Sequence, residues 1–249
     1  MKICVFDTET TSINKPFSYN IGYVIADTET REVLLEKDFV VEQIWHNPML
    51  FCTAYYADKK PLYISSMRAR KAQMKKFGHI TQEMIRDFRF YGVEWAFAYN
   101  SKFDVKVFDF NCDWFKCINP FDSIPVSDIR GFVHRFLVDK KFESFCDEHE
   151  YFTETGNYST TAETVYRYIS NNTDFIEDHT ALSDSKIECD ILFSCLDYGA
   201  EITGDYKAFF SIRKTTKKTL HIKTTEQDDF YFDYTKMKIN KDKTEIILK

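Results

Sequence analysis

The chain opens with four apolar residues, Ile3 to Phe6, that run directly into two carboxylates, Asp7 and Glu9. An apolar run of this kind predicts a buried strand. Side chains two residues apart lie on the same face of a strand, so both carboxylates are expected to point the same way from its end. Two like charges at that separation repel, and a shared divalent cation would keep both ionised. The alternative, which this stretch alone favours, is a strand that ends in an ordinary polar turn.

The same four letters, Asp-Thr-Glu-Thr, occur twice, at residues 7–10 and 27–30. The second copy follows a strand-like run at 19–26, and another strand-like run at 31–35 resumes immediately after it. It therefore predicts the tight turn of a β-hairpin at the far end of the sheet. A polar loop, residues 11–18, follows the first copy instead, which is typical of a strand end that opens onto a site.

Composition narrows the class of protein. A chain of 249 residues is large enough for one well-buried domain with insertions. It has no run of about 18 apolar residues and no basic segment followed by an apolar one at its start, so we expect a soluble, cytoplasmic protein without membrane contact. The net charge of −6 argues against coating nucleic acid through bulk charge. Neither a dinucleotide-binding glycine motif nor a P-loop occurs.

Seven cysteines are spread along the chain, and none forms a C-x2-C pair. An odd, dispersed set of this kind predicts reduced thiols rather than a disulfide framework. Cys146 and His149 have a separation that zinc ligands can have, but no second pair accompanies them, so a core or surface role is expected.

A basic, aromatic insertion occupies about residues 45–78. Its pattern predicts a helix over 62–77 with a positive face, followed by a second helix with Thr81 as its cap. Cationic and aromatic residues together are what a protein uses to hold a single nucleic-acid strand. A solvated basic helix is an equally good reading of the same residues.

A further carboxylate, Asp104, follows the predicted strand at 95–99. Helical spacing after Asn100 places Asp104 in the first turn of a helix, where the helix dipole favours a negative charge. A short strand at 115–119 and helices up to residue 170 are expected next. This order of strands and helices after an N-terminal hairpin predicts an α/β sheet with mixed strand directions.

His179 and Asp184 are five residues apart. On one helix that spacing separates two side chains by roughly 140°, so they converge only if His179 lies before the helix that carries Asp184. An ordinary surface pair is the alternative. After about residue 206, strand-like pieces alternate with the basic stretch 214–218, which predicts a β appendage.

Together these residues form three motifs in order, D-x-E, N-x2-F-D and H-x4-D. In this the chain resembles the DnaQ-like 3′–5′ exonucleases of the DEDDh type, over roughly residues 1–200. Its compact form is also similar to phage-encoded members. The resemblance implies an α/β, ribonuclease H-like fold with a central mixed five-stranded sheet flanked by helices. We accordingly predict an exonuclease domain at 1–205, with the insertion at about 45–78, and a β-rich extension at 206–249.

The resemblance also implies the site. All five family positions are present, and substrate contacts are expected beside them. The implied metal ligands are the carboxylates of Asp7, Glu9, Asp104 and Asp184; the implied general base is His179; and the candidate substrate contacts are Thr8, Thr10, Ile13, Asn100 and Phe103. Two Mg²⁺ or Mn²⁺ ions suit such hard oxygen ligands, and a neutral imidazole suits proton abstraction near neutral pH.

The activity that the resemblance implies is metal-dependent hydrolysis of single-stranded DNA from its 3′ end, with release of nucleoside 5′-monophosphates. An exoribonuclease or oligoribonuclease is the nearest alternative, because no residue reports on the 2′ position. A member of the fold that only binds nucleic acid or a protein is the alternative from another class. Replication or repair partners are not specified by the sequence.

Overall fold

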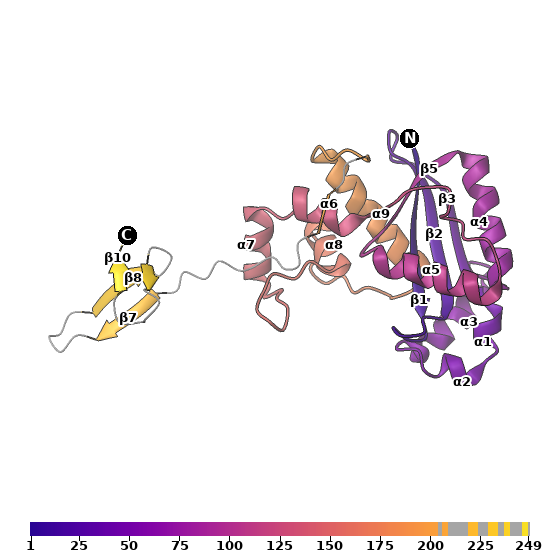
Figure 1. Ribbon diagram of the computed structural model, residues 1–249, viewed down its shortest axis with the longest axis horizontal. Helices are drawn as coiled ribbons and strands as arrows, with labels where there is room; N and C mark the ends of the chain where they lie inside the picture. The colour runs from indigo at the N-terminus through magenta and orange to yellow at the C-terminus, as the bar shows by residue number, and fades with distance from the viewer. Residues whose placement is uncertain (204–205, 209–218, 224–228, 234–236, 240–245, 249) are drawn as a thin grey trace.

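A six-stranded mixed sheet forms the centre of the protein (Figure 1). The computed structural model describes residues 1–203 and 206–208 in full, and the backbone of four short strands between 219 and 248. The strand order is β4-β3-β2-β1-β5-β6. Strand β2 is antiparallel to its neighbours β1 and β3, whereas β5 and β6 run parallel to β1. The strands of this sheet are β1 Lys2–Thr10, β2 Ser18–Asp27, β3 Val33–Val41, β4 Gln73–Lys75, β5 Val93–Ala98 and β6 Val126–Asp128.

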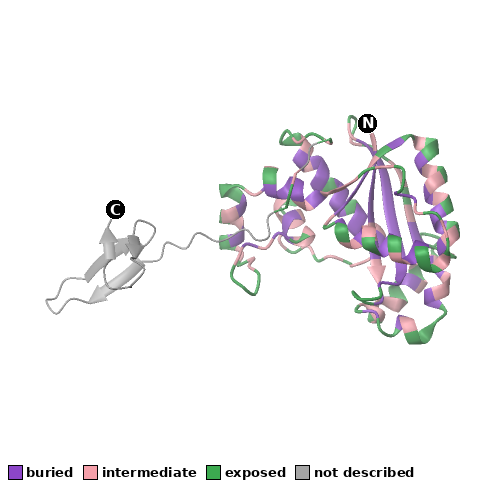
Figure 2. Ribbon diagram, in the orientation of Figure 1, coloured by how far each residue is buried: buried purple, intermediate pink, exposed green. Residues whose placement is uncertain are grey.

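Helices cover both faces of the sheet, whose strands are largely buried (Figure 2). The side chains of β1 alternate between two apolar clusters. Cys4 and Phe6 pack with α4 and α5, whereas Ile3 and Val5 pack with α6 to α9. This alternation is the period of two expected for a strand buried on both faces. The helices are α1 Glu42–Trp45, α2 Pro48–Phe51, α3 Lys60–Arg68, α4 Phe77–Tyr91, α5 Lys102–Phe115, α6 Ile129–Phe136, α7 Lys140–Glu148, α8 Ala162–Ser170 and α9 Ala181–Asp197, with a 3₁₀ turn at Ala57–Lys59.

The predicted hairpin at the second Asp-Thr-Glu-Thr is confirmed. Strand β2 ends at Asp27, and β3 begins at Val33 in antiparallel register. The Asp27 carboxylate accepts hydrogen bonds from the backbone N–H of Glu29 (3.0 Å) and from the ammonium of Lys2. This copy therefore closes a turn, with its charge neutralised by a lysine.

The helix predicted over 62–77 is wrong in its second half. Helix α3 ends at Arg68, Arg70 adopts a left-handed φ of 59°, and β4 follows, paired in parallel with β3. The free edge of β3 offers unpaired backbone groups that three residues can satisfy. This addition makes the sheet six-stranded rather than five-stranded. The α/β class and the mixed strand directions are confirmed.

Two other local predictions are wrong. Thr81 does not cap a helix: it is buried inside α4, and its hydroxyl donates to the carbonyl of Gly78 (3.1 Å). The strand predicted over 115–119 is absent, because α5 continues to Phe115 and ends at Lys116 in a left-handed conformation. The strand that pairs with β5 at this edge of the sheet is β6 instead.

The helix predicted from Thr161 is confirmed as α8, whose N-cap is the Thr161 side chain. In the tail, β7 Thr219–Lys223, β8 Asp229–Asp233 and β10 Ile246–Leu248 fall on predicted strand-like pieces, whereas β9 Met237–Ile239 was not predicted. Strand β7 pairs with β8, and β9 pairs with β10, both antiparallel. The basic stretch 214–218 lies outside the described residues. All seven cysteines are free thiols, as predicted. Among the described residues, no helix is both long and apolar enough to span a lipid bilayer.

Candidate active site

The carboxyl end of β1 carries the first pair of carboxylates. Asp7 and Glu9 continue the alternation of Ile3 and Val5, whose side chains face the helices α6 to α9. In the antiparallel register, Asp7 lies opposite Gly22 of β2. The strand therefore directs both carboxylates to the face of the sheet that α9 covers.

Helix α9 reaches this end of the sheet because Gly22 has no side chain. A Cβ atom at Gly22 would lie 2.1 Å from the backbone nitrogen of Leu182. The Ser185 hydroxyl donates to the Gly22 carbonyl (3.1 Å), and the N–H of Ala181 donates to the side-chain oxygen of Asn20 (2.8 Å). This close docking of α9 on β2 carries Asp184, in the first turn, to the end of β1.

Asp7, Glu9 and Asp184 converge: one carboxylate oxygen from each lies within 4.8 Å of the others. Burial raises the pKa of all three side chains, to about 8 for Glu9 and about 9 for Asp184. Oδ1 of Asp184 is buried and makes no hydrogen bond within the part of the chain that the structure describes. Three crowded carboxylates, of which the buried Asp184 has one oxygen without a partner, form a donor set that fits a hard divalent cation.

Asp104 approaches the same region from the opposite helix layer. It lies in the first turn of α5, as the sequence predicted, and is buried. The hydroxyl of Thr8 donates a hydrogen bond to its carboxylate (2.7 Å). Burial raises the pKa of Asp104 to about 7, and its charge is one of those that raise the pKa of Asp7. Asp104 stands beside the group of Asp7, Glu9 and Asp184 rather than within it.

His179 precedes α9, in the loop where convergence with Asp184 requires it. Its backbone has a left-handed φ of 50°. Its Nδ1 lies 3.6 Å from a carboxylate oxygen of Glu177, and one ligand atom each of Glu177, His179 and Asp184 lie within 4.8 Å of one another. Burial, and then the charge of Lys59, lower the pKa of His179, which favours the neutral imidazole at neutral pH.

Two features of this site were not predicted from sequence. Glu188 is buried next to the carboxylates, accepts a hydrogen bond from the N–H of Tyr99 (3.1 Å), and has a raised pKa because of its burial. It follows Asp184 by four residues on α9, so helical spacing could have revealed it. The other feature is the contact of Tyr56 and Lys59, from the insertion, with the His179 loop. No local pattern signals a contact across about 120 residues.

The predicted substrate contacts lie around the same strand end, in different settings. Thr8 is buried and uses its hydroxyl for Asp104, whereas Thr10 and Phe103 are half-buried. Ile13 is 73% exposed on the loop after β1. Asn100 is exposed, with a φ of 60°. The location of a residue does not by itself identify a nucleotide contact, and all five contacts stay predictions.

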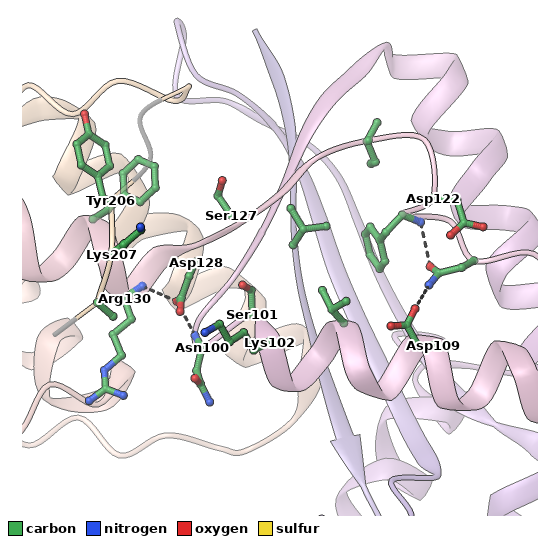
Figure 3. Close-up of a pocket in the computed structure, with 17 residues that line it drawn as sticks. Asn100, Ser101, Lys102, Asp109, Asp122, Ser127, Asp128, Arg130, Tyr206 and Lys207 are labelled. Carbon is green, nitrogen blue, oxygen red and sulfur yellow. Dashed lines mark hydrogen bonds between the residues drawn. The ribbon is translucent and has the colours of Figure 1, made fainter. Parts of the chain in front are cut away.

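A cavity of about 1120 Å³ flanks the site, between the start of α5 and the start of α6 (Figure 3). Asp128 lies at its centre and accepts hydrogen bonds from the N–H groups of Asn100 (2.8 Å) and Arg130 (3.0 Å). Side chains of both signs line the cavity, and the carboxylates at the end of β1 do not. Its lining therefore shows no preference for a ligand of one charge.

Tyr206 forms part of the wall of this cavity. Its ring packs edge-on against Phe132 (4.7 Å) and Phe136 (4.9 Å) of α6, and a Cβ at Gly131 would lie 2.0 Å from the Tyr206 carbonyl oxygen. The chain after α9 thus returns to the core before the β-rich tail begins.

Comparison with known proteins finds the fold among nucleases. No family model and no curated protein sequence matches the chain. Among solved structures, it is similar to the nuclease domain of 3'hExo, a DEDDh family member bound to rAMP, with a TM-score of 0.55 and 14% identity over 83% of this chain and 97% of that one. It is also similar to a 3′-exonuclease that recognises the histone mRNA stem-loop, with a TM-score of 0.56 and 14% identity over 80% and 83% of the two chains. The ribonuclease H-like fold is thereby confirmed.

Proposed function

We propose that the protein is a metal-dependent 3′–5′ exonuclease of the DnaQ-like, DEDDh type. The observation that carries the proposal is the convergence of Asp7, Glu9 and Asp184 within 4.8 Å at the end of β1. The fold shared with DEDDh 3′-exonucleases supports it. Buried carboxylates that repel one another are costly unless they serve a cation, so the cluster is better explained by a metal than by stability.

In this proposal each residue of the site has a defined role. Asp7, Glu9, Asp104 and Asp184 would hold two Mg²⁺ or Mn²⁺ ions, which supply activation of a water and charge stabilisation at the scissile phosphate. Asp7 is linked to all of the others: its carboxylate converges with those of Glu9 and Asp184, and the charge of Asp104 raises its pKa. Neutral His179 would take the proton of the attacking water. Thr8 would hold Asp104 in place through its hydroxyl.

Single-stranded DNA is the substrate that we propose first, with nucleoside 5′-monophosphates as products. RNA is the second candidate: of the neighbours named above, one was solved with rAMP and the other recognises a histone mRNA stem-loop. At 14% identity these ligands do not transfer to this chain. A protein that only binds a strand or a partner would be expected to lose its carboxylates, and here they converge.

The test is digestion of 5′-labelled oligonucleotides of one sequence, as DNA and RNA, single- and double-stranded, with Mg²⁺, Mn²⁺ or EDTA. The proposal expects a ladder that shortens from the 3′ end only when a metal is present. Preferential shortening of RNA would assign the second candidate. If the protein binds the strand but hydrolyses it with neither metal, it is a binding protein rather than an enzyme.

We also propose the division of the chain into an exonuclease domain at 1–205 and a β-rich extension at 206–249. The change from the α/β core to short paired strands after residue 208 supports it. Because Tyr206 packs on α6, a truncation that tests this division should keep residues 206–208.

A further inference from the structure

The basic insertion contacts the loop that carries His179. The ring of Tyr56 stacks on the imidazole of His179, with centroids 4.5 Å apart and planes 13° from parallel. The ammonium of Lys59 lies over the Tyr56 ring, 4.7 Å from its centroid, and donates a hydrogen bond to the carbonyl of Asp178. One residue of the insertion thus touches the side chain of His179, and another touches the backbone beside it.

The insertion is anchored where these contacts begin. Phe51 and Tyr63 are almost fully buried, and both pack edge-on against Tyr19 of β2, at 5.2 Å and 5.9 Å. Lys60 lies over the rings of Trp45 and Phe51. Because Tyr19 also donates a hydrogen bond to Glu9 (3.4 Å), the insertion is seated on the strand next to the carboxylates. Tyr56 and Lys59 therefore project from a packed base.

The loop before α9 needs such support. Residues 175–180 form no helix or strand, and His179 has a left-handed backbone conformation, which a residue with a side chain adopts only when its surroundings fix it. Arg167 donates to the Phe175 carbonyl (2.7 Å), and Asn20 accepts from the N–H of Ala181. These two bonds lie at the ends of the loop. Within it, the N–H of Glu177 donates to Glu163 (3.3 Å), and Lys59 and Tyr56 contact the next two residues, Asp178 and His179.

We propose that Tyr56 and Lys59 form a clamp that positions His179 over the carboxylate cluster, so that the insertion is part of the catalytic apparatus. The proposal rests on the proposed function, since it assigns His179 as the base. Tyr56 is then a positioning residue that fixes the plane of the imidazole, and Lys59 fixes the backbone. The neighbouring Tyr55 is 87% exposed, and its ring packs at about a right angle against that of Tyr56, with centroids 4.8 Å apart.

The kinetic test compares Tyr56→Leu with Tyr56→Phe on the full chain, with Tyr198→Leu as a control at an exposed tyrosine that lies at the end of α9 opposite to Asp184. A displaced base slows the chemical step more than it weakens binding. Tyr56→Leu should lower kcat by at least about 10-fold with KM within about twofold, because supporting residues of a site typically contribute this much. Tyr56→Phe should keep most of the rate, and Lys59→Met should lower kcat as well. If Tyr56→Leu instead raised KM and left kcat unchanged, the clamp would be wrong, and Tyr56 would act by stacking on a base of the substrate.

A second readout does not depend on hydrolysis. In the metal-free full chain, the ring protons of His179 should show the ring-current shift of a stacked tyrosine by NMR, with assignment from His179→Gln. The shift should persist in Tyr56→Phe and Tyr198→Leu and disappear in Tyr56→Leu. Identical His179 resonances in wild type and Tyr56→Leu would overturn the clamp. If wild type hydrolyses no substrate while the shift is present, the proposed function fails and the contact stands.

Discussion

The two copies of Asp-Thr-Glu-Thr have opposite environments. Asp7 lies toward the carboxyl end of β1 among other carboxylates, opposite Gly22, and burial raises its pKa. Asp27 ends β2 opposite Lys2, whose hydrogen bond lowers its pKa. Since β1 and β2 are antiparallel, the copies lie at opposite ends of one strand pair. The same four residues thus form a turn in which Lys2 balances the charge of Asp27 in one place, and part of a cluster of carboxylates in the other.

The environments of Asp7 and Asp27 differ because different side chains pack at the two ends of the β1–β2 pair. At Asp27, the Lys2 ammonium, the chain's amino group (3.8 Å) and the N–H of Glu29 supply positive or donor groups. At Asp7, α5 and α9 bring Asp104 and Asp184 instead. Groups of the protein itself balance the charge of Asp27, whereas the carboxylates around Asp7 require a bound cation.

The largest predicted effect separates the two copies directly. Asp7→Asn should reduce metal-dependent hydrolysis by on the order of 10³-fold, because it removes a carboxylate from the proposed metal site. Asp27→Asn should leave kcat unchanged and slightly lower the melting temperature. Asp184→Asn should behave like Asp7→Asn. Initial rates on a labelled oligonucleotide measure this, and activity of Asp7→Asn near that of wild type would remove the mechanism.

Replacing the base should leave the cluster intact. His179→Ala should retain metal binding and lose on the order of 10²- to 10⁴-fold in rate, the usual contribution of general base catalysis. The comparison is made at saturating metal, with bound Mn²⁺ measured in parallel. A variant that lost metal binding with the rate would show that His179 acts as a ligand instead.

How far the sequence predicts this site depends on the range of the contacts involved. The spacing of Asp7 and Glu9 on a strand and of Asp104 in a first helical turn are local properties, and the structure bears out both placements. The position of His179 before α9 followed from helix geometry. The clamp by Tyr56 joins segments far apart in the chain, and no periodicity reports it. Thr81 and the 115–119 stretch were assigned wrongly because tertiary packing and a left-handed Lys116 set those boundaries.

The docking of α9 offers a smaller, structural test. Gly22→Ala places a Cβ against the backbone of Leu182 and should cost about 1–3 kcal/mol of unfolding free energy, with loss of activity as Asp184 is displaced. The matched control is Gly78→Ala in α4, where the new Cβ meets only Cys117 at 3.4 Å. That change should be neutral or stabilising by up to about 1 kcal/mol. Equal stability of the two variants in urea would contradict the docking.

The smallest effect is the pH dependence of stability without metal. The raised pKa values of Asp104, about 7, and Glu9, about 8, mean that the folded state binds more protons than the unfolded chain near neutrality. The contribution of these groups to stability in EDTA should therefore fall as the pH rises from about 4.5, near the pKa values of the unfolded chain, to about 8, and then level off. Excess Mg²⁺ should reduce this fall, with a difference of a few °C in melting temperature. Asp27, whose pKa is lowered, acts with the opposite sign and only in acid.

Calorimetric titration of Mn²⁺ into the metal-free protein at pH 7 tests the central claim most directly. The crowded carboxylates are partly protonated there, so binding should release protons, visible as a heat that changes with the ionisation enthalpy of the buffer. Asp7→Asn should lose most of this binding, and Asp27→Asn should retain it in full. No Mn²⁺ binding by wild type, or equal binding by wild type and Asp7→Asn, would contradict the account.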